Sequence, residues 1–146
     1  MTIRRDFSLI ELMIVVSIIG VLSSIAIPKF ASMQYRAKRA EVPSNIDGIK
    51  TAETAYNASF DRFVAQTALH PSDPLNKQAR TWAAGSNFDT IGWAPDGKVR
   101  GSYLVNTTDT SFLVLGRCDV DGDGAYAEYH SDQNRNNFRL TSVEVY

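Results

Sequence analysis

The stretch FSLIELMIVVSIIGVLSSIAIP, residues 7–28, is the feature that most limits how this chain can fold. As a helix, residues 7–27 would rise about 30 Å, which is close to the thickness of the hydrocarbon core of a bilayer. Glu11 lies near the start of this apolar run. An ionisable group at membrane depth costs a few kcal/mol, so its presence indicates a function and a partner.

A basic start followed by an apolar run is typical of a secretory signal or of an ordinary membrane anchor. The run from Leu12 to Ile27 is long for a signal peptide, and residues 26–29, AIPK, match an A-x-A-like cleavage site poorly. The sequence therefore favours a stable anchor. About a hundred residues then remain, which is enough for one small globular module.

Composition excludes several classes of function. The net charge of -1 and the isoelectric point of about 6.1 argue against a nucleic-acid-binding protein, which would show clustered basic residues. His70 and His130 are isolated, and Cys118 is the single cysteine, so the sequence shows no catalytic constellation and no intrachain disulfide. We therefore expect a protein that is not an enzyme, with no specific nucleic-acid site.

The helical pattern continues beyond the apolar run. It passes Pro28, resumes after Pro43, and predicts one long helix from about Phe7 to about Phe60, which the two prolines should bend or locally melt. Apolar residues three and four apart predict a buried stripe on its second half. The expected stripe contains Ile46, Ile49, Ala52, Tyr56, Phe60 and Phe63.

The second half of the chain predicts a loop and then a sheet. Residues 64–100 are rich in turn signals, and we expect this region to be mostly loop, with four packing anchors. These anchors are Trp82, Phe88, Ile91 and Trp93. Four segments rich in β-branched and aromatic residues then predict antiparallel strands. They begin at Gly101, Ser111, Ala125 and Leu140. The expected fold class is α+β, with a long N-terminal helix packed on a C-terminal antiparallel sheet.

Residues 4–30, RRDFSLIELMIVVSIIGVLSSIAIPKF, resemble the N-terminus of type IV pilins and pseudopilins, which carry a class III signal peptide. Residues 37–63 also resemble the second half of the pilin helix. A weaker similarity to the C-terminal domains of some of these pilins covers IGWAPDGKVRGSYLV and DVDGDG.

The resemblance implies a processing site and an assembly site. A prepilin peptidase would cut between Asp6 and Phe7 on the cytoplasmic side, and the new amine of Phe7 would be N-methylated. The carboxylate of Glu11 would then pair with the Phe7 amine of a neighbouring subunit, because a paired charge inside an apolar bundle is far better than either charge alone. The chain departs from the family at Asp6, where the family has Gly next to the cleavage site.

The resemblance also implies a division of the chain and a location. Residues 1–6 would be the leader, residues 7–35 the transmembrane and filament-core helix, and residues 36–146 the α+β head. Before assembly the protein would sit in the inner membrane, with a cytoplasmic N-terminus and a periplasmic head. After assembly it would belong to an extracellular pilus.

The implied function is a structural one. The chain would be a major pilin that polymerises with other pilin subunits, through the assembly machinery, into a filament for adhesion, surface motility such as twitching, or uptake. One alternative is a pseudopilin of a type II secretion system. A second alternative is a single-span anchored domain, calcium-binding or enzymatic, that does not polymerise.

The segment DVDGDG predicts either a calcium loop or a hairpin turn. Asp119, Asp121 and Asp123 alternate along it and Gly124 follows, which matches the opening of a D-x-D-x-D-G calcium loop. Three carboxylates so close together would repel one another without a cation. However, Asp-Gly between apolar strands is also a strong turn signal by itself.

A calcium site at this loop would need further ligands. The backbone carbonyl of Ala125 can point inward, but His130 stands where an EF-hand has its bidentate glutamate. Closure would need Glu128, Asp132 or a carboxylate from elsewhere. In a module without a disulfide, such an ion would stabilise the fold.

Overall fold

The computed structural model describes residues 7–72 and 77–146, and Asp6 of the predicted cleavage site lies outside them. The chain divides into two compact units, one ending at Gln34 and the other running from Tyr35 to Tyr146. The first unit contains most of α1 (Leu9–Arg39), and the second unit is the head.

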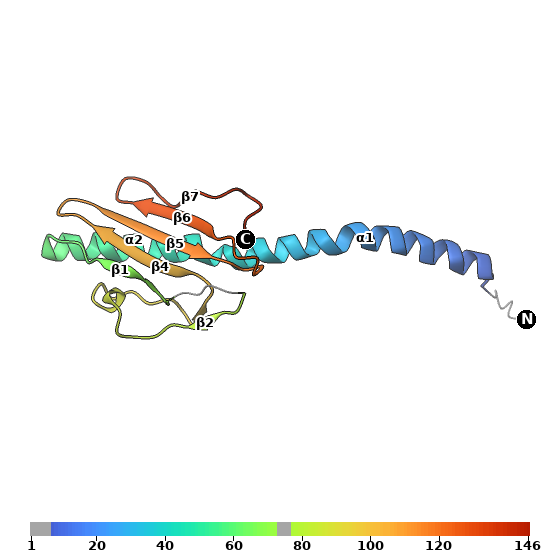
Figure 1. Cartoon of the computed structure of the whole chain (residues 1–146), viewed down its shortest axis with the longest axis horizontal. Coiled ribbons are helices and arrows are strands. Elements are labelled where there is room, and N and C mark those ends of the chain that lie inside the picture. Colours follow the sequence, from blue (N-terminus) through green and yellow to red (C-terminus); the bar gives the residue numbers. More distant parts are fainter. Residues whose placement is uncertain (1–6, 73–76) are drawn as a thin grey trace, which may run out of the picture. The chain divides into compact units, whose positions relative to one another are not determined.

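The predicted long helix is confirmed as two consecutive segments, α1 and α2 (Glu41–Phe60), with the single residue Ala40 between them (Figure 1). Pro43 lies three residues after Ala40 and has no N–H to donate to a carbonyl of the preceding turn, which accounts for an interruption here. The backbone of Ala40 stays in the helical region, so the interruption is slight. Helix α1 continues through Pro28, where a bend stays a prediction.

The head is an antiparallel sheet of five strands in the order β1-β4-β5-β6-β7, with α2 packed on it (Figure 1). The strands are β1 (Gln66–His70), β4 (Ser102–Thr107), β5 (Phe112–Cys118), β6 (Ala127–Asp132) and β7 (Phe138–Arg139). A separate pair is formed by β2 (Arg80–Thr81) and β3 (Lys98–Val99), and a short 3-10 helix covers Asn87–Asp89. The α+β fold expected from the sequence is confirmed.

The core lies between α2 and the sheet. Helix α2 buries Val42, Ile46, Ile49 and Glu53, whose spacing of four, three and four places them on one face. Opposite them, Gly116 of β5 leaves room for the helix, since a Cβ there would lie 2.8 Å from Cδ1 of Ile46. Close contact between α2 and β5 therefore depends on this glycine.

The buried stripe of α2 differs from the predicted one. Phe60 is 60% exposed, and it stacks on the half-buried Tyr56 with ring centroids 4.6 Å apart, outside the core. Glu53 is buried instead, because its carboxylate accepts a hydrogen bond from the backbone N–H of Val64 at 3.1 Å. An acidic residue whose carboxylate accepts a backbone hydrogen bond therefore lies on the buried face of α2, beside three apolar ones.

One prediction about strands is wrong. The strand expected from Leu140 is absent, and the carbonyls of Ser142, Val143 and Val145 accept hydrogen bonds from arginine side chains instead of from a neighbouring strand. Residues 64–100 are mostly loop, as expected, but they also contain the three strands β1, β2 and β3. Two of these strands have only two residues each, too short to show a pattern in the sequence.

The predicted packing anchors of this region are confirmed. Phe88 is buried, and Trp82, Ile91 and Trp93 pack against the core. The rings of Trp82 and Trp93 meet edge to face at 5.3 Å. Trp93 also lies against α2 at Gly48, where a Cβ would come within 2.6 Å of its Nε1.

Candidate functional site: the exposed apolar helix and the acidic loop

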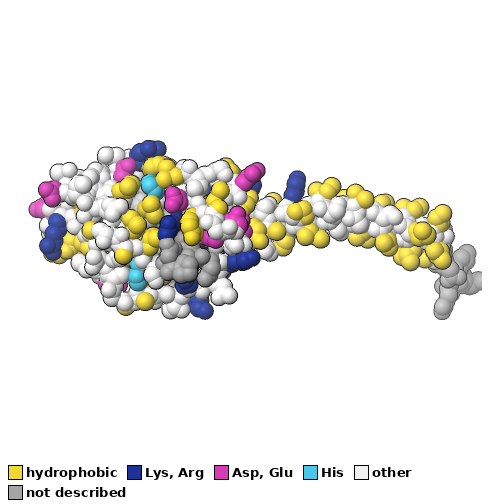
Figure 2. Space-filling view, in the orientation of Figure 1, with side chains coloured by type: hydrophobic (Ala, Val, Ile, Leu, Met, Phe, Trp, Pro, Cys, Tyr) yellow, Lys and Arg dark blue, Asp and Glu magenta, His cyan; other side chains and the backbone are white. Residues whose placement is uncertain are grey.

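The N-terminal part of α1 presents an exposed apolar surface. Its large apolar side chains from Leu9 to Phe30 are all between 45% and 76% exposed. By length and composition this helix is able to cross a membrane. Figure 2 shows hydrophobic side chains along the visible face of this segment. A soluble monomer rarely exposes an apolar surface of this size, so lipid or other apolar helices must cover it.

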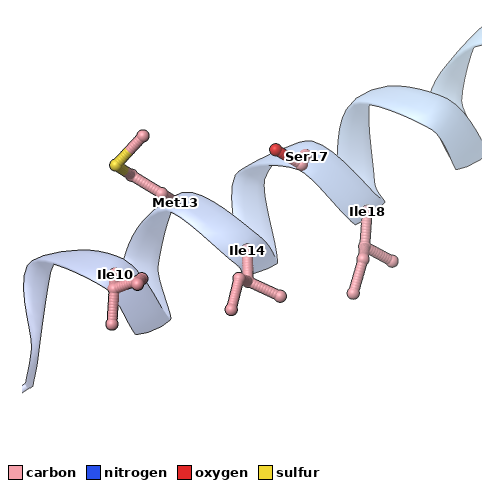
Figure 3. A pocket seen from close by; sticks show the side chains of 5 residues that line it. All are labelled: Ile10, Met13, Ile14, Ser17 and Ile18. Carbon is pink, nitrogen blue, oxygen red and sulfur yellow. The ribbon is translucent and has the colours of Figure 1, made fainter.

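Shallow hollows lie along this helix. One is lined by Ile10, Met13, Ile14, Ser17 and Ile18 (Figure 3), and the next by Ser17, Ile18, Val21 and Leu22. The small side chain of Ser17 is shared by both hollows. A small residue between larger ones forms the kind of groove into which the side-chain ridge of another helix packs.

Glu11 lies in the first turn of α1, where its Oε2 accepts a hydrogen bond from the backbone N–H of Ser8 at 2.9 Å. Ser8 precedes the first helical residue, so Glu11 completes one half of a capping box. Within one chain, therefore, the carboxylate satisfies a free N–H at the start of the helix. Phe7 is 80% exposed beside it. The pair between Glu11 and the Phe7 amine of another subunit stays a prediction.

The three aspartates of the acidic loop come together. Asp119, Asp121 and Asp123 each offer a carboxylate oxygen, and these oxygens lie within 4.8 Å of one another. Gly122 and Gly124 have φ values of 77° and 84°, which side-chain-bearing residues rarely adopt. The two glycines thus allow the sharp turn that gathers the carboxylates.

Some of the carboxylate oxygens of the acidic loop accept hydrogen bonds from backbone N–H groups of the same loop. Buried Asp119 accepts from the N–H of Gly122 at 2.6 Å and of Gly124 at 3.1 Å, and Asp123 accepts from the N–H of Ala125 at 2.7 Å. Asp121 differs, because its Oδ1 is buried and has no partner among the described residues. Burial, and then the nearby charge of Asp123, raise the pKa of Asp121.

Glu128 and Asp132, the two residues expected to close a calcium site, lie near opposite ends of β6. Glu128 stands on β6, opposite Arg117 of β5 and near the loop end of the strands. Asp132 lies at the other end of β6, where its Oδ1 accepts from the N–H groups of Asn134 and Arg135 at 2.7 and 2.8 Å. The structure therefore does not bring Asp132 to the cluster.

The three residues that the sequence left without a catalytic role take part in packing. His70 contacts the carbonyl of Ala83 at 2.9 Å and meets the Trp82 ring edge to face. His130 packs on the ring of Phe138, and burial lowers its pKa. Cys118 is fully buried, and burial raises its pKa to about 12, so the thiol stays protonated at neutral pH.

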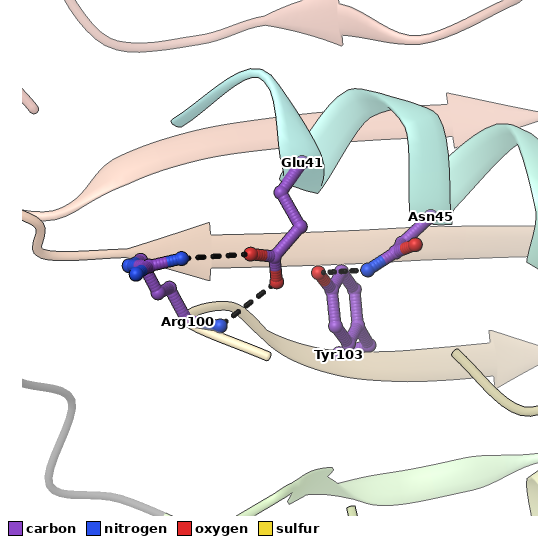
Figure 4. Close-up of polar contacts among 4 residues, drawn as sticks. All are labelled: Glu41, Asn45, Arg100 and Tyr103. Carbon is purple, nitrogen blue, oxygen red and sulfur yellow. Dashed lines mark hydrogen bonds and ion pairs between the residues drawn. The ribbon is translucent and has the colours of Figure 1, made fainter. Parts of the chain in front are cut away.

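Sequence reasoning missed a polar junction between α2 and the sheet (Figure 4). Glu41 accepts from the backbone N–H of Arg100 at 2.8 Å, and its other oxygen lies 3.7 Å from the Arg100 guanidinium. One helical turn further, the side-chain amide of Asn45 donates to the hydroxyl of Tyr103 at 2.8 Å. These contacts hold the start of α2 on the strands. The only sequence signal for this junction was the spacing of Glu41 and Asn45, which lie one turn apart on the helix.

A helix whose large apolar side chains are exposed, followed in the sequence by a small α+β head, defines a membrane-anchored or helix-assembling class of protein. Comparison with known proteins identifies the family. The chain is 48% identical over 117 residues to the type IV major pilin protein PilA of Myxococcus xanthus, covering 80% of this chain and 41% of that protein. It is 30% identical over 118 residues to a fimbrial protein of Moraxella nonliquefaciens, covering 80% of this chain and 76% of that protein.

A third relative is the type IV major pilin protein PilE1 of Neisseria gonorrhoeae, at 40% identity over 121 residues, covering 83% of this chain and 47% of that protein. No family model and no solved structure matches the chain. The chain thus spans less than half the length of two of these relatives and about three quarters of the other. It belongs to the type IV pilin family.

Proposed function

We propose that this chain is a structural subunit of a type IV pilus, a major pilin that polymerises with other pilin subunits through its N-terminal helix. The exposed apolar surface of α1 carries the proposal, because it needs neighbours and because its hollows fit other helices. The relatives support a pilus over a secretion pseudopilus or a non-polymerising anchored domain, since they are named pilins and fimbrial proteins. These are names of structural proteins, which also supports a role that is not enzymatic.

Assembly would begin in the inner membrane, with the N-terminus in the cytoplasm and the head in the periplasm. A prepilin peptidase would cut between Asp6 and Phe7, and Phe7 would be N-methylated. The Glu11 carboxylate, which in one chain contacts only the N–H of Ser8 among the described residues, would then meet the Phe7 amine of a neighbouring subunit. This pairing favours assembled over unassembled helices, because it neutralises both charges away from water. The finished filament would be extracellular and would serve adhesion, surface motility or uptake.

Electron microscopy of cells that express the chain, with mass spectrometry of the purified filaments, tests this function. We expect filaments whose subunits begin at N-methylated Phe7. Glu11→Ala should reduce the number of filaments, since it removes the charge pair and leaves the head intact. Ser8→Ala is the matched control, because it retains the backbone N–H that Glu11 binds and the carboxylate itself. Filaments of normal number from Glu11→Ala would contradict the pairing, and the lack of filaments from the unchanged chain would contradict the function.

We also propose that the acidic loop of this pilin binds calcium. The convergence of three carboxylates within 4.8 Å and the unpartnered, buried Oδ1 of Asp121 support this role. Hard oxygen ligands of this kind are those that calcium prefers. The calcium dependence of the melting temperature tests it.

A further inference from the structure

Residues 142–146, which we call the tail segment, are attached to the head in an unusual way. They form no strand, and two arginine side chains supply most of the donors for their carbonyl groups. Arg39, in the last turn of α1, donates to the carbonyls of Val143 at 3.3 Å and Val145 at 2.5 Å. Arg139, in β7, donates to the carbonyls of Ser142 and, at 2.6 Å, Val145.

The two arginines come from elements far apart in the sequence. Arg39 is only 8% exposed, and its guanidinium lies 5.1 Å from the centre of the Tyr146 ring. The Tyr146 ring in turn meets Tyr35 of α1, with centroids 5.6 Å apart. The tail segment therefore connects the end of α1 to the sheet through charge-assisted hydrogen bonds and one aromatic pair.

The tail segment also lies over part of the core. Val145 and Tyr146 pack against the cluster that includes Cys118 and Val120. The carbonyl of Tyr146 accepts the backbone N–H of Val120 at 3.1 Å. Cys118 itself is completely buried, two residues before Val120.

We propose that the tail segment is a latch that opens as a local unit, separately from the sheet, and that its opening frees the end of α1 and uncovers Cys118. The reason is the difference between its contacts and those of the strands. Strands β4, β5 and β6 share continuous backbone ladders. Within the described part of the chain, the hydrogen bonds that hold the tail segment on the rest of the head come instead from the side chains of Arg39 and Arg139 and from the backbone N–H of Val120. Segments with few backbone contacts open at lower free energy than the core of a sheet.

Thiol labelling of the full-length chain in non-ionic detergent tests the latch, since Cys118 is the single cysteine and every label reports on one site. In the unchanged protein we expect slow labelling by N-ethylmaleimide, with a rate that depends little on urea at low concentrations. Global unfolding would instead give the steep urea dependence of the whole head. Labelling that follows the global unfolding curve at all urea concentrations would overturn the proposal.

Two variants test the arginines. Arg39→Met and Arg139→Met remove the donors and keep long apolar side chains, and each should accelerate labelling about tenfold, the factor expected when charge-assisted hydrogen bonds are lost. Arg36→Met, at an exposed position one turn earlier in α1, is the matched control and should label at the original rate. Unchanged labelling in both Arg39→Met and Arg139→Met would overturn the proposal.

Hydrogen exchange in the unchanged protein gives a test that needs no variant to fold. The amide of Val120, bonded to the tail segment, should exchange at least tenfold faster than the amides of the central strand β5. Equal protection of Val120 and of β5 would show that the tail segment opens only with the sheet, and would overturn the latch.

Discussion

Gly116→Ala should destabilise the head by crowding the contact between β5 and α2. A Cβ at Gly116 would lie 2.8 Å from Cδ1 and 3.0 Å from Cγ1 of Ile46, and 2.9 Å from Cγ1 of Val42. Ile46 and Val42 are fully buried, so neither can move into solvent. Overpacking of this kind costs about 2 kcal/mol. Alanine also restricts the unfolded chain, which offsets roughly 0.5 kcal/mol, so we expect a net loss of about 1.5 kcal/mol.

A second substitution tests whether this contact is the cause. Ile46→Val removes Cδ1, the atom closest to the new methyl group, and by itself should cost about 1 kcal/mol. Together with Gly116→Ala it should relieve the crowding, so the double variant should be clearly more stable than the sum of the two losses predicts. Strict additivity of the two losses would refute the packing argument.

Tryptophan fluorescence of the chain in non-ionic detergent is a suitable assay, since Trp82 and Trp93 both pack against the core of the head and Trp93 lies against α2. A loss of about 1.5 kcal/mol should lower the melting temperature by roughly 6 °C in a unit of this size. Gly20→Ala is the control, because a Cβ at Gly20 of α1 meets nothing within 4 Å and should leave the transition of the head unchanged. An unchanged melting temperature in Gly116→Ala would also refute the reasoning.

Two further predictions concern carboxylates. Burial raises the pKa of Glu53 above its ordinary value of 4.5, so the folded head should lose stability as the pH rises from 4.5 through the raised pKa. Glu53→Gln should remove this loss. The melting temperature of the variant should therefore rise relative to that of the unchanged chain between pH 4.5 and pH 7. A difference in melting temperature that stays constant over this range would contradict the raised pKa of Glu53. Calcium at a hundred times its dissociation constant should stabilise the head by about 2.7 kcal/mol, a rise of several degrees in melting temperature. Asp121→Asn combined with Asp123→Asn should abolish this rise, and a chelator should reverse it; equal melting temperatures with calcium and with chelator in the unchanged chain would show that the loop is only a turn.

The features that the sequence determined by itself depend on local patterns. An apolar run of bilayer length with Glu11 near its start is enough to predict a membrane-spanning helix. The resemblance of residues 4–30 to the N-terminus of type IV pilins then indicates the family. Strands β4 and β5 follow from their β-branched and aromatic residues, and β6 overlaps the segment expected from Ala125. The gathering of Asp119, Asp121 and Asp123 likewise follows from alternation along one short loop.

Contacts between distant segments were decided only by the tertiary structure. Glu53 is buried and Phe60 exposed because the N–H of Val64 needs an acceptor and because the sheet contacts only one face of α2, and neither condition can be read from a helical period. Asp132 and Glu128 are close in the sequence, but the length of β6 separates them. The tail segment reads as a strand, yet Arg39, about a hundred positions earlier, binds its carbonyls in place of a neighbouring strand. The physical reason is the same in each case. A backbone group forms a hydrogen bond with whichever donor or acceptor the fold places beside it, whereas a sequence pattern carries information only about residues that are close in the sequence.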